Sequence, residues 1–352
     1  MTSVRQIARS LLLQAARVEA QTLRLPGTDR VLRWLYHPDH RQDDYLAFVG
    51  PSDDSLVQID TRIFLEWSVY LYGTYRPVAA DLLRRLLQPG DVAFDLGANV
   101  GLFTLPMARR VGPAGAVHAF EPHPGVRRRL IGNLALNNLR NVVVSHLALG
   151  ADRRQLTLYA SSSPGQGVAT AHPLDVRNGA AYARTDEPVV CEMNTLDSYV
   201  QESGVHQVDL LKISVCSDDL SVLKGARETL QTYKPPVYLS LWADFLATYG
   251  TTPSEVLRVL HDLGYEIWLD RNGSRRRSVP SRGAARDRGR ESRLERVLES
   301  RGIRLSPLSN LERADEWLES YWLAVHPGRV RLANASPADG SAAVSALERS
   351  RV

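Results

Sequence analysis

The residues best suited to chemistry are a glycine-rich turn and an acid that follows it. The run Asp95-Leu96-Gly97-Ala98-Asn99-Val100-Gly101 comes directly after an apolar segment. Glycine allows a backbone turn to approach a ligand without obstruction from a Cβ atom. Glu121 lies 20 residues after Gly101, where the next apolar segment ends. An acid at that place can accept hydrogen bonds from both ribose hydroxyls of a nucleoside cofactor.

The spacing of this turn argues against several other ligand classes. It is not GxGxxG, the pattern of nicotinamide and flavin sites, and it is not the GxxxxGK[ST] of a phosphate-binding loop. The chain also has no CxxC or HExxH pattern, so we expect no metal site. The remaining alternative is a tight strand-to-helix turn that binds nothing.

Apolar segments alternate with segments of helical pattern along the chain. The expected strands are Val92–Leu96, Ala116–Phe120, Val142–Leu147, Gln155–Ala160, Pro188–Glu192, Val208–Val215 and Val237–Leu241, with Tyr265–Leu269 and Tyr321–Val325 as a closing pair. The expected helices are Val78–Leu87, one from the turn to about Val111, Pro124–Leu136, Leu220–Leu230 and Pro253–Leu263. Because the strands are almost wholly apolar, this alternation predicts a doubly wound α/β fold with a buried parallel sheet.

Several further motifs follow the turn in a fixed order. The matching motifs are Phe94-Asp95-Leu96-Gly97-Ala98-Asn99-Val100-Gly101, Ala119-Phe120-Glu121-Pro122, Asn133, Asn137, Asn141-Val142, Ala148-Leu149, Thr195-Leu196-Asp197, Val208-Asp209-Leu210-Leu211-Lys212-Ile213 and Leu223-Lys224-Gly225-Ala226. Over about Val92 to Val325 the chain resembles the FkbM-type methyltransferase family, whose members use S-adenosylmethionine to methylate hydroxyl oxygens on natural products and sugars. The resemblance implies a class I methyltransferase fold, with a mostly parallel seven-stranded sheet and an antiparallel closing strand.

The resemblance also implies which residues hold the cofactor. They are Asp95, Gly97, Asn99, Gly101, Glu121, Pro122, His146 and Ala148. Asp95 would hold the methionine amino group through water. Gly97, Asn99 and Gly101 would line the methionine moiety. Glu121 would take the ribose hydroxyls. His146 and Ala148 would flank the adenine.

The sequence departs from the family pattern after the fourth strand, which makes the chain a divergent member. Where the family usually reads Asp-Val-Glu-Gly, this chain has Ser214-Val215-Cys216-Ser217, followed by Asp218 and Asp219. A hydroxyl must lose its proton as it takes up a methyl group, and a positioned base contributes about 10²–10⁴-fold. Asp218, Asp219 and Lys212 are the catalytic candidates. The acids could instead cap a helix, and the lysine could instead pair with a carboxylate.

Length and composition set the domain organisation. In the chain of 352 residues we expect an N-terminal extension over 1–76, with an amphipathic helix and a mixed cap. A cofactor-binding domain would occupy 77–327, with an Arg-rich insertion at 271–300, and a disordered tail 328–352. Two cysteines are too few for a disulfide framework, and there is no apolar run of membrane-spanning length, so a cytoplasmic location is expected.

The distribution of charged residues indicates which partners the protein could bind. Between Arg271 and Arg301 there are eleven arginines and four acids, whereas the rest of the chain is slightly acidic. A general nucleic-acid surface is therefore not supported, although this one basic segment keeps a nucleic-acid role open. The main hypothesis is an S-adenosylmethionine-dependent O-methyltransferase that acts on a hydroxyl of a small molecule or glycan. The main alternative is a catalytically degenerate relative that serves as a binding or scaffold module. A homodimer is left open.

Overall fold

The structure is a computed structural model. It describes residues 44–48, 55–60, 63, 66, 69–70, 73, 75–160, 169–170, 174–177, 180–183, 188–215, 218–276, 305–327 and 329. The expected N-terminal helix, the Arg-rich insertion after Arg276 and almost all of the expected tail lie outside these residues. The domain boundaries therefore stay predictions. No helix of the described residues is both long enough and apolar enough to cross a membrane.

The centre of the fold is an eight-stranded sheet with the strand order β15-β14-β16-β13-β12-β3-β4-β5. Its strands are β3 (Val92–Leu96), β4 (Ala116–Phe120), β5 (Val142–Ser145), β12 (Leu210–Ile213), β13 (Val237–Trp242), β14 (Glu266–Arg276), β15 (Leu305–Pro307) and β16 (Trp317–Val325). The five from β5 to β13 are parallel, and β16 runs antiparallel between β13 and β14. This order confirms the predicted fold class. The strand beyond the expected seven is β15, whose Leu-Ser-Pro sequence has no strand-like pattern.

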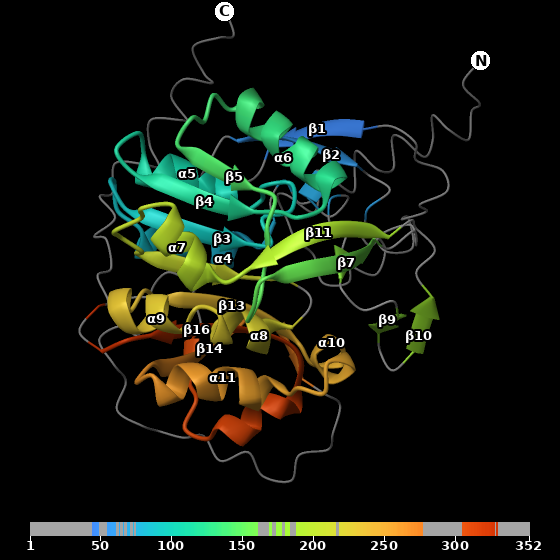
Figure 1. The fold of residues 1–352 in the computed structure, drawn as a ribbon, viewed down its shortest axis with the longest axis vertical. Helices are drawn as coiled ribbons and strands as arrows, with labels where there is room; N and C mark the ends of the chain where they lie inside the picture. The colour runs from blue at the N-terminus through green and yellow to red at the C-terminus, as the bar shows by residue number, and fades with distance from the viewer. Residues whose placement is uncertain are drawn as a thin grey trace, which may run out of the picture.

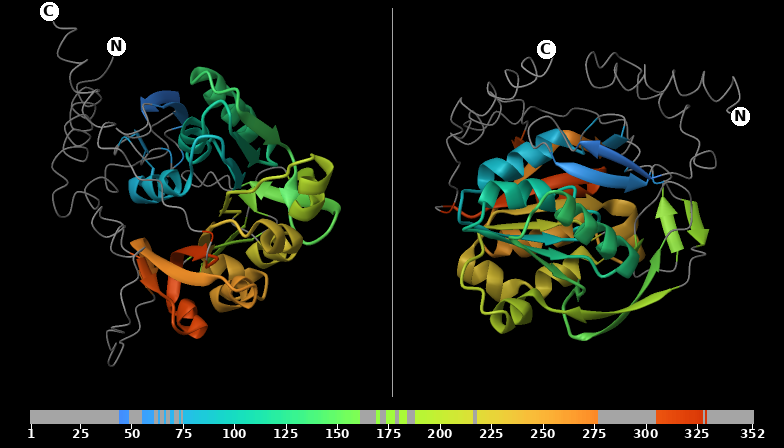
Figure 2. Two further views of the ribbon diagram at one scale, coloured as in Figure 1. Left: turned by 90° about the vertical axis from the view of Figure 1, so that its left-hand side faces the viewer. Right: turned by 90° about the horizontal axis from the view of Figure 1, so that it is seen from above.

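Helices cover both faces of this sheet (Figure 2). One face carries α4 (Pro77–Leu86), α5 (Thr104–Val111) and α6 (Pro124–Leu136), and the other carries α7 (Leu196–Glu202), α8 (Asp219–Lys224), α9 (Arg227–Tyr233) and α11 (Pro253–Asp262). Successive side chains of a strand point to opposite faces. Phe94 and Leu96 therefore pack under α7 to α11, whereas Ala93 packs under α4 and α5. The short helix α10 (Ala243–Thr248) follows β13, and the 3-10 helix η2 (Leu311–Glu316) precedes β16.

The helix expected over Leu220–Leu230 is two helices, α8 and α9. At Gly225 a Cβ atom would lie 1.9 Å from the carbonyl oxygen of Gly150, so only glycine allows the chain to pass there. Helix α9 then starts anew, and the carboxylate of Asp197 accepts hydrogen bonds from the backbone N–H groups of Glu228 and Thr229. A carboxylate at a helix N-terminus satisfies otherwise unbonded amides. These contacts explain the Thr-Leu-Asp and Leu-Lys-Gly-Ala motifs as structural.

A smaller sheet lies beside the large one and has the order β6-β11-β7-β8 (Figure 1). It consists of β6 (Ala148–Leu149), β7 (Arg154–Ala160), β8 (Ala169–Thr170) and β11 (Val189–Asn194). The expected strand Val142–Leu147 ends at Ser145, because the chain leaves the large sheet there and pairs with β11 as β6. Two further antiparallel pairs are β1 (Asp44–Phe48) with β2 (Leu56–Asp60), and β9 (Leu174–Arg177) with β10 (Ala180–Ala183).

Candidate functional site

The glycine-rich turn lies at the carboxyl end of β3, at the centre of the large sheet. The backbone N–H groups of Gly97 and Ala98 both donate to the carbonyl oxygen of Phe120, at 3.1 and 3.0 Å, which ties the turn to the end of β4. Three residues of the turn have positive φ angles: Gly97 at 78°, Asn99 at 51° and Gly101 at 100°. Asparagine adopts this left-handed conformation more readily than most residues with a side chain. The turn is thus a bent, fixed segment at the edge where ligands bind in such sheets.

The two glycines of the turn make room for the protein itself. A Cβ atom on Gly97 would lie 2.2 Å from the carbonyl oxygen of Ser214, and one on Gly101 would lie 2.9 Å from Cδ1 of Leu130. From the sequence, we expected the glycines to make room for a ligand. In the structure their first role is to let the turn pack against β12 and α6, which fixes where its backbone groups point.

Asp95 is fully buried below the turn and has charged and polar partners. Its Oδ2 atom accepts a hydrogen bond of 2.6 Å from the hydroxyl of Thr104, and its Oδ1 atom lies 2.8 Å from Nζ of Lys212. Nζ also donates to the carbonyl oxygen of Gly97 at 2.9 Å. The structure therefore brings the predicted catalytic lysine to the predicted cofactor residues, where it holds a carboxylate and the turn together. Thr104 is a contributor that the sequence analysis missed.

Glu121 lies at the carboxyl end of β4 with its carboxylate against the turn. Oε2 accepts a hydrogen bond of 3.0 Å from the backbone N–H of Asn99, and Oε1 accepts one of 3.0 Å from that of His123. Burial raises the pKa of Glu121 to about 7, although these hydrogen bonds and the charges of Lys212 and Arg127 partly offset that rise. Each carboxylate oxygen accepts one backbone hydrogen bond and retains a second lone pair.

The other predicted cofactor residues follow the ends of β4 and β5 and differ in exposure. The carbonyl oxygen of Pro122 accepts a hydrogen bond of 2.8 Å from Arg127. His146 follows the end of β5 with a largely exposed side chain, and its Nε2 lies 3.8 Å from the carboxylate of Glu192. Ala148 is buried in β6. Burial raises the pKa of Cys191 to about 11, and the charge of Glu121 adds to that rise, so β11 passes near this carboxylate.

The two aspartates after β12 differ in what they contact. Asp218 caps α8, because its Oδ1 accepts a hydrogen bond of 3.0 Å from the backbone N–H of Ser221. Asp219 is buried at the first position of the helix, and its Oδ1 has no hydrogen-bond partner among the residues that the structure describes. Burial, and secondly the neighbouring Asp218, raises the pKa of Asp219 to about 8. A buried carboxyl group with a strongly raised pKa is a candidate functional group.

Three further observations concern His118, Cys216 and the side chains that could bind a metal. His118 packs within β4, where its ring stacks on Phe94 and its Nδ1 lies 2.8 Å from the hydroxyl of Tyr199, so it is a core residue. Cys216 lies outside the described residues. Within the described part of the chain, no group of three or more acidic, histidine or cysteine side chains could hold a metal ion.

The sheet order, the turn after β3 and the acid after β4 together define a class I methyltransferase fold. Residues 95–267 match the family described as the methyltransferase FkbM domain. The chain is 31% identical over 202 residues to methyltransferase sdnD of Sordaria araneosa, and this match covers 50% of the chain and 74% of that protein. The chain belongs to the FkbM methyltransferase family, as the resemblance predicted.

In two further relatives, the match covers a smaller share of the relative's length. The 31-O-demethyl-FK506 methyltransferase FkbM of Streptomyces tacrolimicus is 30% identical over 167 residues, which is 40% of this chain and 62% of that protein. The AMB antimetabolite synthetase AmbE of Pseudomonas aeruginosa is 32% identical over 167 residues, which is 40% of this chain and 8% of that protein. The match therefore spans only part of the length of these two proteins.

Proposed function

We propose that this chain is an S-adenosylmethionine-dependent O-methyltransferase that acts on a hydroxyl group of a small molecule or glycan. The observation that carries the cofactor assignment is the carboxylate of Glu121, held on both oxygens by the N–H groups of Asn99 and His123. A buried carboxylate is stabilised by further donors. Two adjacent ribose hydroxyls would supply such donors.

The hydroxyl acceptor is supported by a relative. The protein from Streptomyces tacrolimicus is named as a methyltransferase of 31-O-demethyl-FK506, a name that indicates methylation of an oxygen. Because that match spans only part of either chain, the acceptor class is a proposal for this protein. The natural acceptor would bind beyond the carboxyl ends of β12 and β13, next to the turn, where ligands of such sheets bind.

The cofactor would supply a methyl group on a positively charged sulfur, and the protein must align it with the acceptor oxygen. Alignment alone can supply much of the rate of such a displacement. The proton of the hydroxyl must also leave, and Asp219 is the group that we assign to accept it. Its raised pKa makes it a stronger base than an ordinary aspartate, while Asp218 holds the start of α8 in place.

Calorimetric titration with S-adenosylmethionine and S-adenosylhomocysteine tests the cofactor assignment. We expect wild-type protein to bind both, and Glu121→Gln to weaken binding about tenfold or more, because a neutral amide replaces a charged acceptor. Glu192→Gln is the matched control, since the side chain of Glu192 is 73% exposed. If the folded wild type binds neither ligand, the proposal is wrong and the scaffold alternative is favoured. If it binds, a screen of hydroxylated acceptors for methyl transfer follows.

A further inference from the structure

Helix α6 holds strand β2 through three side chains spaced four residues apart. Asn137 accepts a hydrogen bond from the backbone N–H of Leu56 and donates one to the carbonyl oxygen of the same residue, at 2.9 and 2.7 Å. Asn133 accepts one of 2.8 Å from the N–H of Gln58, and Arg129 donates one of 3.2 Å to the carbonyl oxygen of Gln58. The helix therefore bonds four consecutive polar groups on one edge of β2.

The spacing of residues along the helix matches the spacing of residues along the strand. Four residues of an α-helix rise about 6 Å, and two residues of a strand rise about 6.6 Å. Side chains one helical turn apart can thus reach every second residue of a strand that runs alongside. Because β1 pairs with the other edge of β2, α6 closes an edge that would otherwise be open to another strand.

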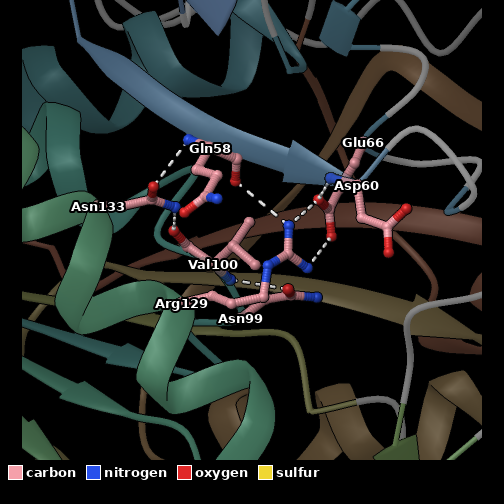
Figure 3. Close-up of polar contacts among 7 residues, drawn as sticks. All are labelled: Gln58, Asp60, Glu66, Asn99, Val100, Arg129 and Asn133. Atoms are coloured by element: carbon pink, nitrogen blue, oxygen red, sulfur yellow. Dashed lines mark hydrogen bonds and ion pairs between the residues drawn. The ribbon is translucent and has the colours of Figure 1, made fainter. Parts of the chain in front are cut away.

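Asn133 has a second contact, and this one is on the cofactor turn. Its Nδ2 atom donates a hydrogen bond of 2.8 Å to the carbonyl oxygen of Val100, while its Oδ1 atom holds Gln58 (Figure 3). Both Asn133 and Val100 are fully buried. The residue before Val100 is Asn99, whose N–H donates to Glu121. One amide side chain therefore links β2 to the segment that orients the ribose-binding carboxylate.

A buried ion pair fixes the same region one helical turn earlier. The guanidinium of Arg129 contacts both carboxylate oxygens of Glu66, and Glu66 also accepts a hydrogen bond from the backbone N–H of Asp60 (Figure 3). Glu66 is 1% exposed, so its charge depends on these partners. Apolar contacts add to them, because Val57 and Ile59 pack in one cluster with Val100.

We infer that Asn133 is a positioning residue for the cofactor turn, and that β2 and Glu66 form part of the cofactor-binding unit. The inference rests on the proposed function for the identity of the ligand. It assigns a role to a segment that precedes the matched family region, which begins at residue 95. Cofactor affinity should therefore depend on a contact that touches no cofactor atom.

The test compares two asparagines in the full-length chain by titration with S-adenosylhomocysteine. Asn133→Leu removes the contact to Val100, and we expect it to weaken binding about tenfold. Asn141→Leu is the matched control, because Asn141 also donates two side-chain hydrogen bonds of 2.8 Å to carbonyl oxygens, those of Ala108 and Gly112, which lie outside the turn. We expect it to destabilise the fold similarly and to change affinity less than about twofold.

Two further measurements keep the inference testable if Asn133→Leu does not fold. Asn133→Asp keeps an acceptor for Gln58 and loses only the donor to Val100, so it should also weaken binding. In the wild type, S-adenosylhomocysteine should slow hydrogen exchange at the amide of Gln58, but not in β15 at the far edge of the sheet. If Asn133→Asp binds as the wild type does, or if Gln58 is unaffected by ligand, the inference is wrong. Failure of the wild type to bind would instead count against the proposed function.

Discussion

The ammonium group of Lys212 lies 2.8 Å from the carboxylate of Asp95, and both side chains are almost completely buried. The same ammonium donates to the carbonyl oxygen of Gly97, so one lysine neutralises the acid below the turn and holds the turn itself. A base must be able to take a proton from the substrate. Lys212 already forms an ion pair with Asp95 and donates a hydrogen bond to Gly97 inside the protein, and we therefore assign it a positioning role.

Replacing Lys212 by methionine should destabilise the fold strongly. The substitution keeps the length of the side chain but leaves the carboxylate of Asp95 buried without its cation, which costs about 3–5 kcal/mol. Urea unfolding would measure the loss in the free energy of unfolding. Lys224→Met is the control, because Lys224 is exposed and we expect a change of less than about 0.5 kcal/mol. Similar losses in both variants would contradict the assignment.

The close packing of Gly97 leads to a second prediction about stability. Gly97→Ala should cost more stability than Gly90→Ala, although both positions have positive φ angles, of 78° and 92°. A Cβ atom on Gly90 meets nothing within 4 Å, so only backbone strain of about 1 kcal/mol is expected there. At Gly97 the new atom meets the backbone of Ser214, and we expect a further 1–3 kcal/mol, roughly. Thermal unfolding of the two variants measures the difference, and equal losses would show that the turn can shift away from β12.

Regular local patterns made much of the fold predictable from the sequence. The expected strands Val92–Leu96 and Ala116–Phe120 and the helix Pro124–Leu136 have the same bounds in the structure. The two strands are apolar runs that follow a glycine-containing turn, and the helix begins at a proline. The break between α8 and α9 was not predicted. Its cause is the contact of Gly225 with Gly150, which lies 75 residues earlier and leaves no local signal.

The candidate site was predictable only where its residues directly follow two successive strands of the regular pattern. The turn and Glu121 are such a case, since their hydrogen bonds join neighbouring strands. The difference between Asp218 and Asp219 was not readable, because it depends on which carboxyl group reaches the amides of α8 and which one is buried. The role of Asn133 was missed for a similar reason, since its partners lie on β2 and on the turn.

The raised pKa of Glu121 predicts that cofactor affinity depends on pH. With a pKa of about 7, the carboxyl group is about one-tenth ionised at pH 6 and about nine-tenths at pH 8. Ribose hydroxyls donate best to the ionised form, so affinity for S-adenosylhomocysteine should rise up to about tenfold over this interval. Calorimetry at several pH values measures it. Glu192→Gln should keep this rise and Glu121→Gln should lose it, whereas an unchanged pH profile in Glu121→Gln would assign the dependence to another group.

The raised pKa of Asp219 makes a prediction for stability. Its pKa is about 8 in the folded protein and 3.8 ordinarily, so between these values the folded state retains a proton that the unfolded state releases. The free energy of unfolding should therefore fall as pH rises from about 4 to about 8. Asp219→Asn has no such proton to lose. Urea unfolding should find it close to the wild type near pH 4, and more stable by about 2–5 kcal/mol at pH 9.

The same substitution separates a base from a structural acid once an acceptor is found. Asp219→Asn should slow methyl transfer by about 10²–10⁴-fold while cofactor affinity stays unchanged, because the amide cannot accept the proton of the hydroxyl. Asp218→Asn is the adjacent control. Asparagine caps helices about as well as aspartate does, so this variant should keep the cap. It removes a charge that raises the pKa of Asp219, but it should change stability and rate far less than Asp219→Asn does. If Asp219→Asn is more stable at high pH but slow in methyl transfer, Asp219 serves catalysis and destabilises the folded state. Transfer at the wild-type rate in Asp219→Asn would instead require another base.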